Sequence, residues 1–190
     1  MTKLREIEID YGLTEILLEN DLLELVLLPF KGGDIYCLVY KPAGVDLLLK
    51  TPRGINAPDQ GVQTSLDSEA IWMDNYPGGW QLLFPNGGDV CFYKELELNF
   101  HGEASVAPWR YELRQRGGET VLRLETDLCK SPFRIERTLL PSPGTARFAI
   151  QETIRNGSPE SEWPFARAKN LVDVIDLSVL PPRNEVRDIL

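Results

Sequence analysis

The residues best suited to chemistry lie in one stretch of the chain, between positions 74 and 109. Aromatic, amide, imidazole and carboxylate side chains recur there among prolines and glycines, and the candidates are Trp80, Gln81, Asn86, His101 and Glu103. Aromatic faces cover apolar C–H patches, and planar amides or carboxylates form paired hydrogen bonds with hydroxyl groups. The mixture suits a small polyhydroxylated ligand, and the glycines would let the backbone approach it.

Each candidate also has a plain structural interpretation. Trp80 and Gln81 fit a core tryptophan beside an exposed glutamine at least as well as a binding pair. His101 is the only histidine in the chain and so the only side chain with an unperturbed pKa near neutrality. In a strand, Glu103 would project to the same face as His101 and could share a pocket wall with it. A surface histidine beside an ordinary glutamate fits the same pattern.

Short strands are the elements expected to position these residues. Apolar and polar residues alternate with period two in residues 6–9, 121–125 and 133–139. The pair Gly117-Gly118 predicts a hairpin between residues 111–116 and 119–125. Residues 22–28 are almost continuously apolar, which favours a strand covered on both faces, although a buried helix fits the run as well. Frequent strands and turns predict an all-β chain, an antiparallel β-sandwich or barrel.

The rest of the sequence limits the choice of class. Residues 51–74, rich in proline, glycine and polar residues, predict a long loop, and no linker divides the 190 residues, so we expect a single domain. The three cysteines, widely spaced, predict reduced thiols, and one histidine with scattered carboxylates predicts no metal site. We expect a cytoplasmic protein because no apolar leader or spanning segment is present. A net charge of −9 argues against nucleic acid and anionic membranes as partners.

Several of these segments together resemble the aldose 1-epimerase (galactose mutarotase-like) family. They are Gly78-Gly79-Trp80-Gln81, Phe84-Pro85-Asn86, His101-Gly102-Glu103 and Pro108-Trp109, with Gly32-Gly33-Asp34-Ile35 near the start. The resemblance runs from about Leu22 to Asn156. It implies a supersandwich of two large antiparallel sheets that holds a sugar in a concave groove. It also implies interconversion of the anomers of a free aldose by acid–base ring opening, without a cofactor.

The resemblance also implies roles for single residues. The histidine of the family's HG motif lies in the sugar site, which implies a catalytic role for His101. Trp80, Gln81, Asn86 and Glu103 are implied as substrate-binding residues. Ser105 stands where the branch that acts on hexose 6-phosphates has an arginine, so the resemblance favours an unphosphorylated sugar.

The C-terminal part departs from the family. The family has a second catalytic histidine and a late glutamate, and neither has a counterpart in the divergent tail, residues 157–190. We therefore expect an incomplete supersandwich with reduced or no activity, and self-association through exposed sheet edges. The alternative function is a non-catalytic carbohydrate-binding β-sandwich. A sandwich with an interaction or structural role and no sugar site is a third possibility.

Overall fold

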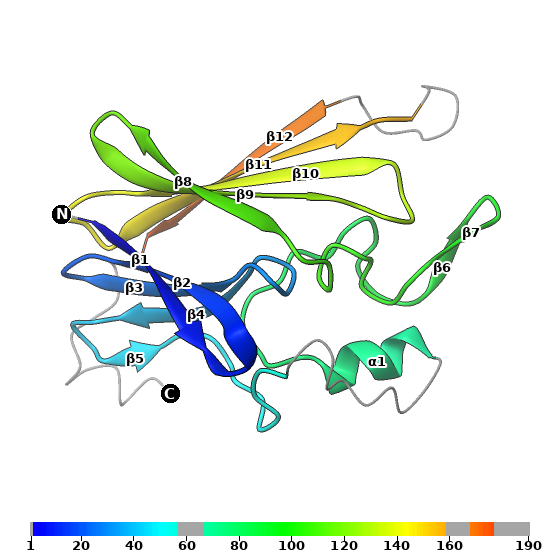
Figure 1. The fold of residues 1–190 in the computed structure, drawn as a ribbon, viewed down its shortest axis with the longest axis horizontal. Helices are drawn as coiled ribbons and strands as arrows, with labels where there is room; N and C mark the ends of the chain where they lie inside the picture. Colours follow the sequence, from blue (N-terminus) through cyan, green and yellow to red (C-terminus); the bar gives the residue numbers. More distant parts are fainter. Residues whose placement is uncertain (1, 57–66, 159–167, 177–190) are drawn as a thin grey trace.

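Two five-stranded antiparallel sheets dominate the structure, a computed structural model that describes residues 2–56, 67–158 and 168–176 (Figure 1). The first sheet is a meander in chain order: β1 (Lys3–Ile9), β2 (Leu13–Glu19), β3 (Leu23–Leu28), β4 (Asp34–Tyr40) and β5 (Val45–Asp46), with a 3₁₀ turn at Asp10–Gly12 between β1 and β2. The second sheet is another meander: β8 (Arg110–Arg116), β9 (Glu119–Asp127), β10 (Phe133–Pro141), β11 (Arg147–Asn156) and β12 (Ala168–Asp176). The predicted all-β sandwich is confirmed.

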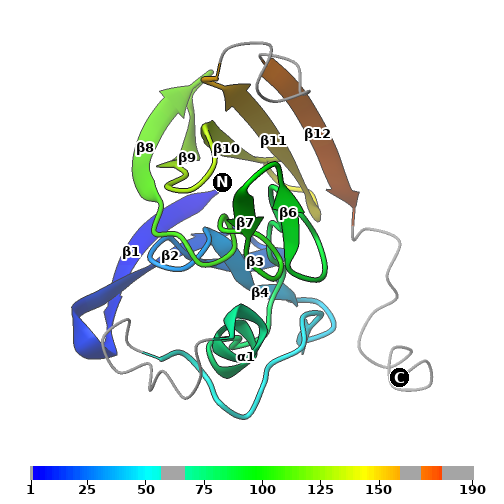
Figure 2. The same cartoon turned by 90° about the vertical axis from the view of Figure 1, so that its right-hand side faces the viewer.

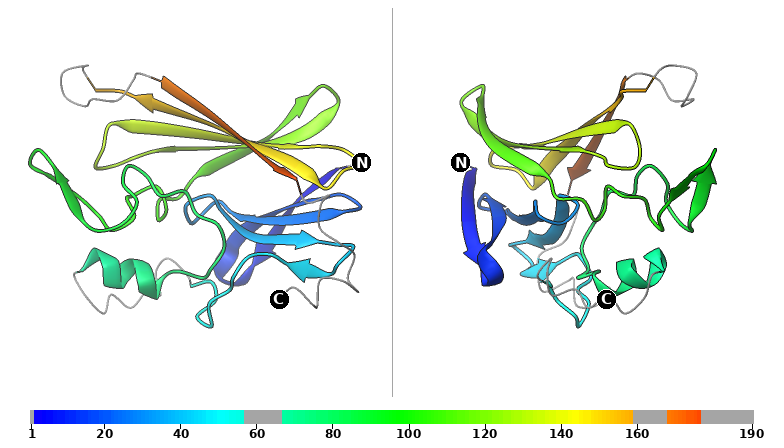
Figure 3. Two further views of the ribbon diagram at one scale, coloured as in Figure 1. Left: turned by 180° about the vertical axis from the view of Figure 1, so that it is seen from behind. Right: turned by 45° about the vertical axis from the view of Figure 1, so that its right-hand side comes forward.

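The two sheets lie face to face, as the view from behind also shows (Figure 3). Along β10, buried and half-buried residues alternate without interruption over Phe133–Leu140, as the sequence pattern predicted. Fully buried side chains from both sheets meet in one core: Leu25, Leu27 and Ile35 from the first, and Leu122, Leu139 and Phe148 from the second. Burying a side chain of this size stabilises the fold by roughly 1.5–3 kcal/mol.

Two local predictions are confirmed in detail. The hairpin of β8 and β9 turns at Gly117 and Gly118, whose φ angles of 60° and 84° are both positive. Paired positive φ angles match the right-handed twist of the flanking strands, and glycine adopts them without a steric cost. The apolar run at residues 22–28 forms β3, a strand paired on both sides, by β2 and β4, which settles the choice between strand and helix.

The connection between the sheets forms a separate group at one end of the sandwich (Figures 1 and 2). It contains the helix α1 (Ser68–Asp74) and the small hairpin of β6 (Cys91–Tyr93) and β7 (Leu96–Leu98). The predicted loop at 51–74 is therefore wrong in its last seven residues, which form α1. The helix begins because the Asp67 side chain accepts a hydrogen bond from the backbone N–H of Glu69 at its N-terminus. Residues 57–66 lie outside the described part.

Part of the predicted divergent tail is a strand. β12 pairs with β11 over the whole length from Ala168 to Asp176 and ends the second sheet. The rest of the tail, beyond Ser158, lies outside the described residues. Two other outer strands, β1 and β8, each contain four charged residues. All three cysteines are free thiols. Among the described residues, no helix has the length and apolarity needed to span a membrane.

Candidate functional site

His101 lies in a tight turn. Residues 100–106 form consecutive turns between β7 and β8, and His101 and Gly102 both have positive φ angles, 59° and 71°. A Cβ atom on Gly102 would lie 2.3 Å from the carbonyl oxygen of Phe84, so the packing requires glycine. The expectation that His101 and Glu103 share one face of a strand is wrong, because the chain turns between them.

The imidazole of His101 is held through Nδ1. The backbone N–H of Gly88 donates to Nδ1 at 2.9 Å, and the backbone N–H of His101 donates to the Gly88 carbonyl at 2.8 Å. Because Nδ1 accepts from an amide, the neutral ring carries its proton on Nε2. Within the described residues Nε2 makes no hydrogen bond, and it is not one of the buried polar atoms without a partner. His101 can therefore offer an N–H donor to a ligand.

Two aromatic rings contact this imidazole. Trp72 of α1 meets His101 edge to face, with ring centroids 4.6 Å apart, and Phe100 lies 3.9 Å away. Tyr76 stacks on Trp72 at 4.7 Å. The Ser68 hydroxyl accepts a 3.1 Å hydrogen bond from the backbone N–H of Phe100, which ties α1 to the turn. The ring wall therefore depends on a helix that the sequence pattern missed.

Asn86 belongs to the same unit as His101. Its Nδ2 donates to the carbonyls of Asn99 at 3.0 Å and Asp89 at 3.2 Å, so it joins the loop around Gly88 to the turn of His101. Its Oδ1 is buried and makes no hydrogen bond in the described structure. The structure thus brings Asn86 and His101 together, with Asn86 supporting the loop that holds the imidazole.

Trp80 and Gln81 lie elsewhere, against the first sheet. The backbone of Trp80 exchanges two hydrogen bonds with Ile35, of 2.8 and 3.0 Å. The Gln81 Nε2 donates to Asp34 Oδ2 at 2.8 Å, and Lys31 Nζ donates to the same oxygen at 2.8 Å. Burial raises the pKa of the fully buried Asp34 carboxyl, while Lys31 and Gln81 act in the opposite direction. Gln81 therefore helps to satisfy one oxygen of a buried carboxylate, whose other oxygen, Oδ1, has no hydrogen-bond partner among the described residues.

The cavity beside Trp80 and Gln81 is small. It has a volume of about 100 Å³ and is lined by Ile35, Trp80, Gln81, Leu82, Arg137, Ile150 and Glu152. Ligand pockets usually measure roughly 300–1,000 Å³, so this space suits a few water molecules better than a pyranose. His101 is not part of the lining among the described residues. Direct contact of Trp80 and Gln81 with a sugar stays a prediction.

Two of the residues that line this cavity, Arg137 and Glu152, form a buried ion pair. Arg137 and Glu152 face each other on β10 and β11, and Nε and Nη2 of the guanidinium donate to Glu152 Oε1 at 2.8 and 2.6 Å. Nη1 donates to the Gly33 carbonyl at 2.8 Å, and the guanidinium lies 5.4 Å from the centre of the Trp109 ring. The pair therefore connects the second sheet to the first.

Glu103 has a structural task. Its Oε2 accepts the backbone N–H groups of Cys129 and Lys130, and its Oε1 accepts the backbone N–H and the hydroxyl of Ser131. The four distances are 2.8, 2.8, 2.8 and 2.6 Å. A carboxylate offers about four lone-pair sites, so little capacity is left for a sugar hydroxyl. Direct binding of a ligand by Glu103 stays a prediction.

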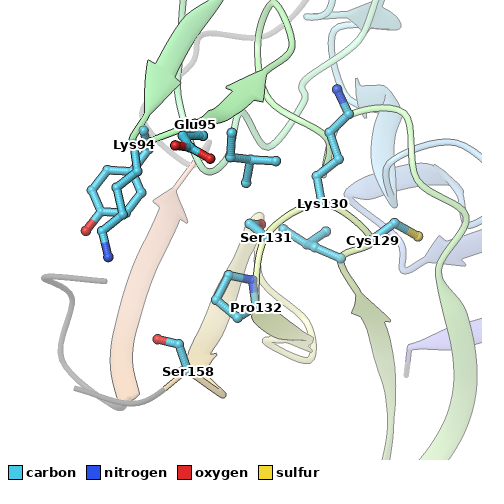
Figure 4. A pocket seen from close by; sticks show the side chains of 10 residues that line it. Lys94, Glu95, Cys129, Lys130, Ser131, Pro132 and Ser158 are labelled. Atoms are coloured by element: carbon cyan, nitrogen blue, oxygen red, sulfur yellow. The ribbon is translucent and has the colours of Figure 1, made fainter. Parts of the chain in front are cut away.

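A wide groove lies between the loop that connects β9 to β10, residues 128–132, and the β6–β7 hairpin (Figure 4). Its volume is about 850 Å³, within the usual range for ligand sites. The lining combines apolar, hydroxyl and charged side chains: Tyr93, Lys94, Glu95, Leu96, Leu128, Cys129, Lys130, Ser131, Pro132 and Ser158. The Lys130 ammonium is already placed by hydrogen bonds to Asn99 Oδ1 at 2.6 Å and the Glu97 carbonyl at 3.4 Å.

Two further expectations concern the phosphate group of a ligand and metal ions. Ser105, the position used to argue for an unphosphorylated sugar, is fully buried, so its side chain faces no open pocket. The phosphorylation state of the ligand stays a prediction. Within the described residues, no three histidine, cysteine or carboxylate side chains are grouped closely enough to hold a metal ion.

Comparison with known proteins shows what the fold resembles. No protein-family model matches the chain, and no curated protein matches it. A solved structure from Synechocystis sp. PCC 6803 is 22% identical over 75% of this chain and 48% of its own, with a TM-score of 0.53. A provisional aldose 1-epimerase from Klebsiella pneumoniae subsp. pneumoniae is 14% identical over 82% and 43%, with a TM-score of 0.61. A galactose mutarotase-like protein from Clostridium acetobutylicum is 14% identical over 83% and 50%, with a TM-score of 0.55.

The chain has a galactose mutarotase-like sandwich fold. It spans about half the length of these solved structures. At such low identity the similarity concerns the fold alone, and a fold does not by itself fix an activity.

Proposed function

We propose that this protein binds a free, unphosphorylated aldose beside His101 and speeds the interconversion of its anomers. Anomer exchange requires proton movement at the anomeric hydroxyl and at the ring oxygen. The observation that carries the proposal is the Gly88 N–H on Nδ1, which leaves the proton of the neutral ring on Nε2. A neutral imidazole N–H of this kind can polarise an oxygen without carrying a full charge. We assign this donor to the sugar ring oxygen.

The surroundings of His101 support the same assignment. Trp72 and Phe100 provide apolar ring surface next to the imidazole, of the kind that covers the C–H patches of a sugar. The positive φ angle of His101 is uncommon for a residue other than glycine, and such conformations gather at functional sites. The mutarotase-like fold adds a general expectation of a sugar-related ligand.

The test is the rate of anomer exchange of glucose and galactose, followed by polarimetry or exchange NMR, in the wild-type protein and two matched variants. In His101→Asn, the side-chain oxygen can replace Nδ1 as the acceptor for Gly88, and asparagine tolerates a positive φ angle. This variant keeps the turn but loses the Nε2 donor. In His101→Gln, the side-chain amide reaches the position of Nε2.

We expect catalysis in the wild-type protein, only the uncatalysed rate in His101→Asn, and partial activity in His101→Gln. Equal rates in wild-type protein and His101→Asn would refute the role of Nε2. A wild-type rate equal to the uncatalysed one for both sugars would exclude the isomerase activity for them.

A non-catalytic carbohydrate-binding protein is the second candidate, and one observation favours it. The chain has a single histidine, and the carboxylates of Asp34 and Glu103 near the candidate residues are engaged in internal hydrogen bonds. A binder would change the fluorescence of Trp72 on addition of sugar without any change in the anomer exchange rate. Loss of that response in Trp72→Phe, with the same melting temperature, would place the sugar at this site.

A further inference from the structure

The loop between β9 and β10 has the geometry of an anion site. The N–H groups of three successive residues, Cys129, Lys130 and Ser131, converge on one carboxylate, that of Glu103, and each N–H to oxygen distance is 2.8 Å. The Ser131 hydroxyl adds a fourth donor at 2.6 Å. Successive backbone N–H groups that point to one centre form a recognised type of anion-binding concavity.

The occupant of this concavity comes from a distant part of the chain. Glu103 is 26 residues before Cys129 and belongs to the turn that carries His101. Gly102 alone separates the two residues, and its contact with Phe84 leaves no space for a side chain. The same loop is also attached through Lys130, whose ammonium donates to Asn99 Oδ1 at 2.6 Å. The turn of residues 99–103 is therefore joined to the β9–β10 loop twice, through its own Glu103 carboxylate and through the Lys130 ammonium group of the loop.

We propose that the β9–β10 loop is a preformed binding site for a carboxylate, that Glu103 is its built-in ligand, and that Glu103 thereby positions His101. Removing the Glu103 side chain would leave four convergent donors without an acceptor. A small free carboxylate such as formate or acetate supplies the same two oxygens and would fill the site. This inference needs no sugar and goes beyond the proposed function, because it concerns how the turn is held.

The experiment uses Glu103→Ala and Glu103→Gln, with the wild-type protein, titrated with sodium formate and sodium acetate. Sodium chloride at the same ionic strength is the control. Glu103→Gln fills the space but turns one oxygen into an N–H donor that faces other donors, so it should neither hold the loop nor admit formate. The readouts are the melting temperature and the amide NMR signals of Cys129, Lys130, Ser131 and Gly88.

We expect a lowered melting temperature in both variants and a saturable rise on addition of formate in Glu103→Ala only. The amide signals of Cys129, Lys130 and Ser131 should return toward their wild-type positions with one common dissociation constant. The Gly88 amide, which donates to His101 Nδ1, should shift in the variant and return with the same constant. Formate acting no better than chloride would overturn the anion site. An unmoved Gly88 signal would overturn the positioning of His101.

A measurement on the wild-type protein keeps the proposal open to refutation if Glu103→Ala fails to fold. Cys129 and Lys130 are exposed residues, so their amides would exchange rapidly with solvent if nothing bound them. The proposal expects these two amides to exchange slowly, together with that of Ser131. Rapid exchange of the Cys129 and Lys130 amides in a folded protein would contradict it.

Discussion

Removal of the Glu152 charge is the sharpest test of how the two sheets are held together. The side chains of Arg137 and Glu152 are only 5% and 10% exposed, so the guanidinium is kept from water and depends on its partner. Removing one member of a buried pair usually costs about 3–5 kcal/mol, because the other charge stays buried without compensation. In Glu152→Gln the amide oxygen still accepts a hydrogen bond, and the Asp34 charge acts on Arg137 from nearby. We therefore expect about 3 kcal/mol, the low end of the range.

The assay is urea unfolding at neutral pH, with the free energy of unfolding taken from the midpoint and slope. A loss of about 3 kcal/mol corresponds to roughly a hundredfold change in the folding equilibrium. Arg134→Ala on the outer face of the same strand is the control, since Arg134 is 40% exposed and its pair with Glu125 is worth less than about 1 kcal/mol. The double variant Arg137→Met with Glu152→Leu removes both charges and should lie close to the wild-type protein. A Glu152→Gln variant as stable as the Arg134→Ala control would refute the reasoning.

Three further predictions follow from single residues. Burial raises the pKa of the Cys37 thiol to about 11, so at pH 8 iodoacetamide should modify the exposed Cys91 and Cys129 well before Cys37, as measured by mass spectrometry. Burial works against the ionised form of Asp46, but hydrogen bonds from Lys50 and from the Leu48 and Leu38 amides lower its pKa overall. The stability that the ionised Asp46 carboxylate contributes is therefore present above its unfolded pKa of about 3.9 and is lost as the pH falls through the lower folded value. Asp46→Asn should flatten the decline of the melting temperature over this pH range. Gly102→Ala should lower the melting temperature and disturb the His101 turn, because its φ is 71° and the new Cβ would clash with Phe84. Gly118→Ala is the control, since Gly118 also has a positive φ but has open space around it, so this variant measures the cost of the positive φ without a clash.

The sandwich could be predicted because apolar and polar residues alternate along its strands. In residues 133–139 the inward positions include Phe133, Ile135 and Leu139, and the same parity places Arg137 inside. On β11 the parity that buries Phe148 and Ile150 also buries Glu152. The sequence therefore contained a signal for a buried charge pair, an arginine and a glutamate each at an inward position. What it lacked was the register, which comes from the pairing of β10 with β11 over the whole of both strands.

The arrangement of the site was harder to predict, because His101 and its neighbours lie in turns and not in strands with a regular pattern. Helix α1 had a local signal in Asp67, Ser68 and Glu69, a capping residue followed by polar residues typical of a first helical turn. Trp72 lies in this helix, whereas its stacking partner Tyr76 follows the C-cap at Asn75, so no helical spacing pointed to their contact. Proline and glycine around them favoured a loop instead.

The separation of Trp80 and Gln81 from His101 depends on contacts that no local pattern encodes. Trp80 pairs with Ile35, which is 45 positions away, and Gln81 with Asp34, which is 47 away. Those contacts draw residues 80 and 81 onto the first sheet, whereas Gly88 and Phe84 hold the His101 turn from outside it. Of the clustered candidates, Asn86 thus supports the His101 turn, whereas Trp80 and Gln81 line a cavity whose described lining lacks His101.

The capacity of each carboxylate for hydrogen bonds ties these observations to chemistry. A carboxylate can act on a ligand only through lone pairs that the protein has left free. Glu103 has none to spare. Asp34 Oδ2 is shared by Lys31 and Gln81, whereas Asp34 Oδ1 has no hydrogen-bond partner among the described residues but belongs to a fully buried side chain. His101 differs, because the backbone N–H of Gly88 binds Nδ1 and leaves Nε2 free to act on a ligand. We therefore expect the proton chemistry of a sugar at this site to involve His101 Nε2, with the base supplied by a group other than Glu103.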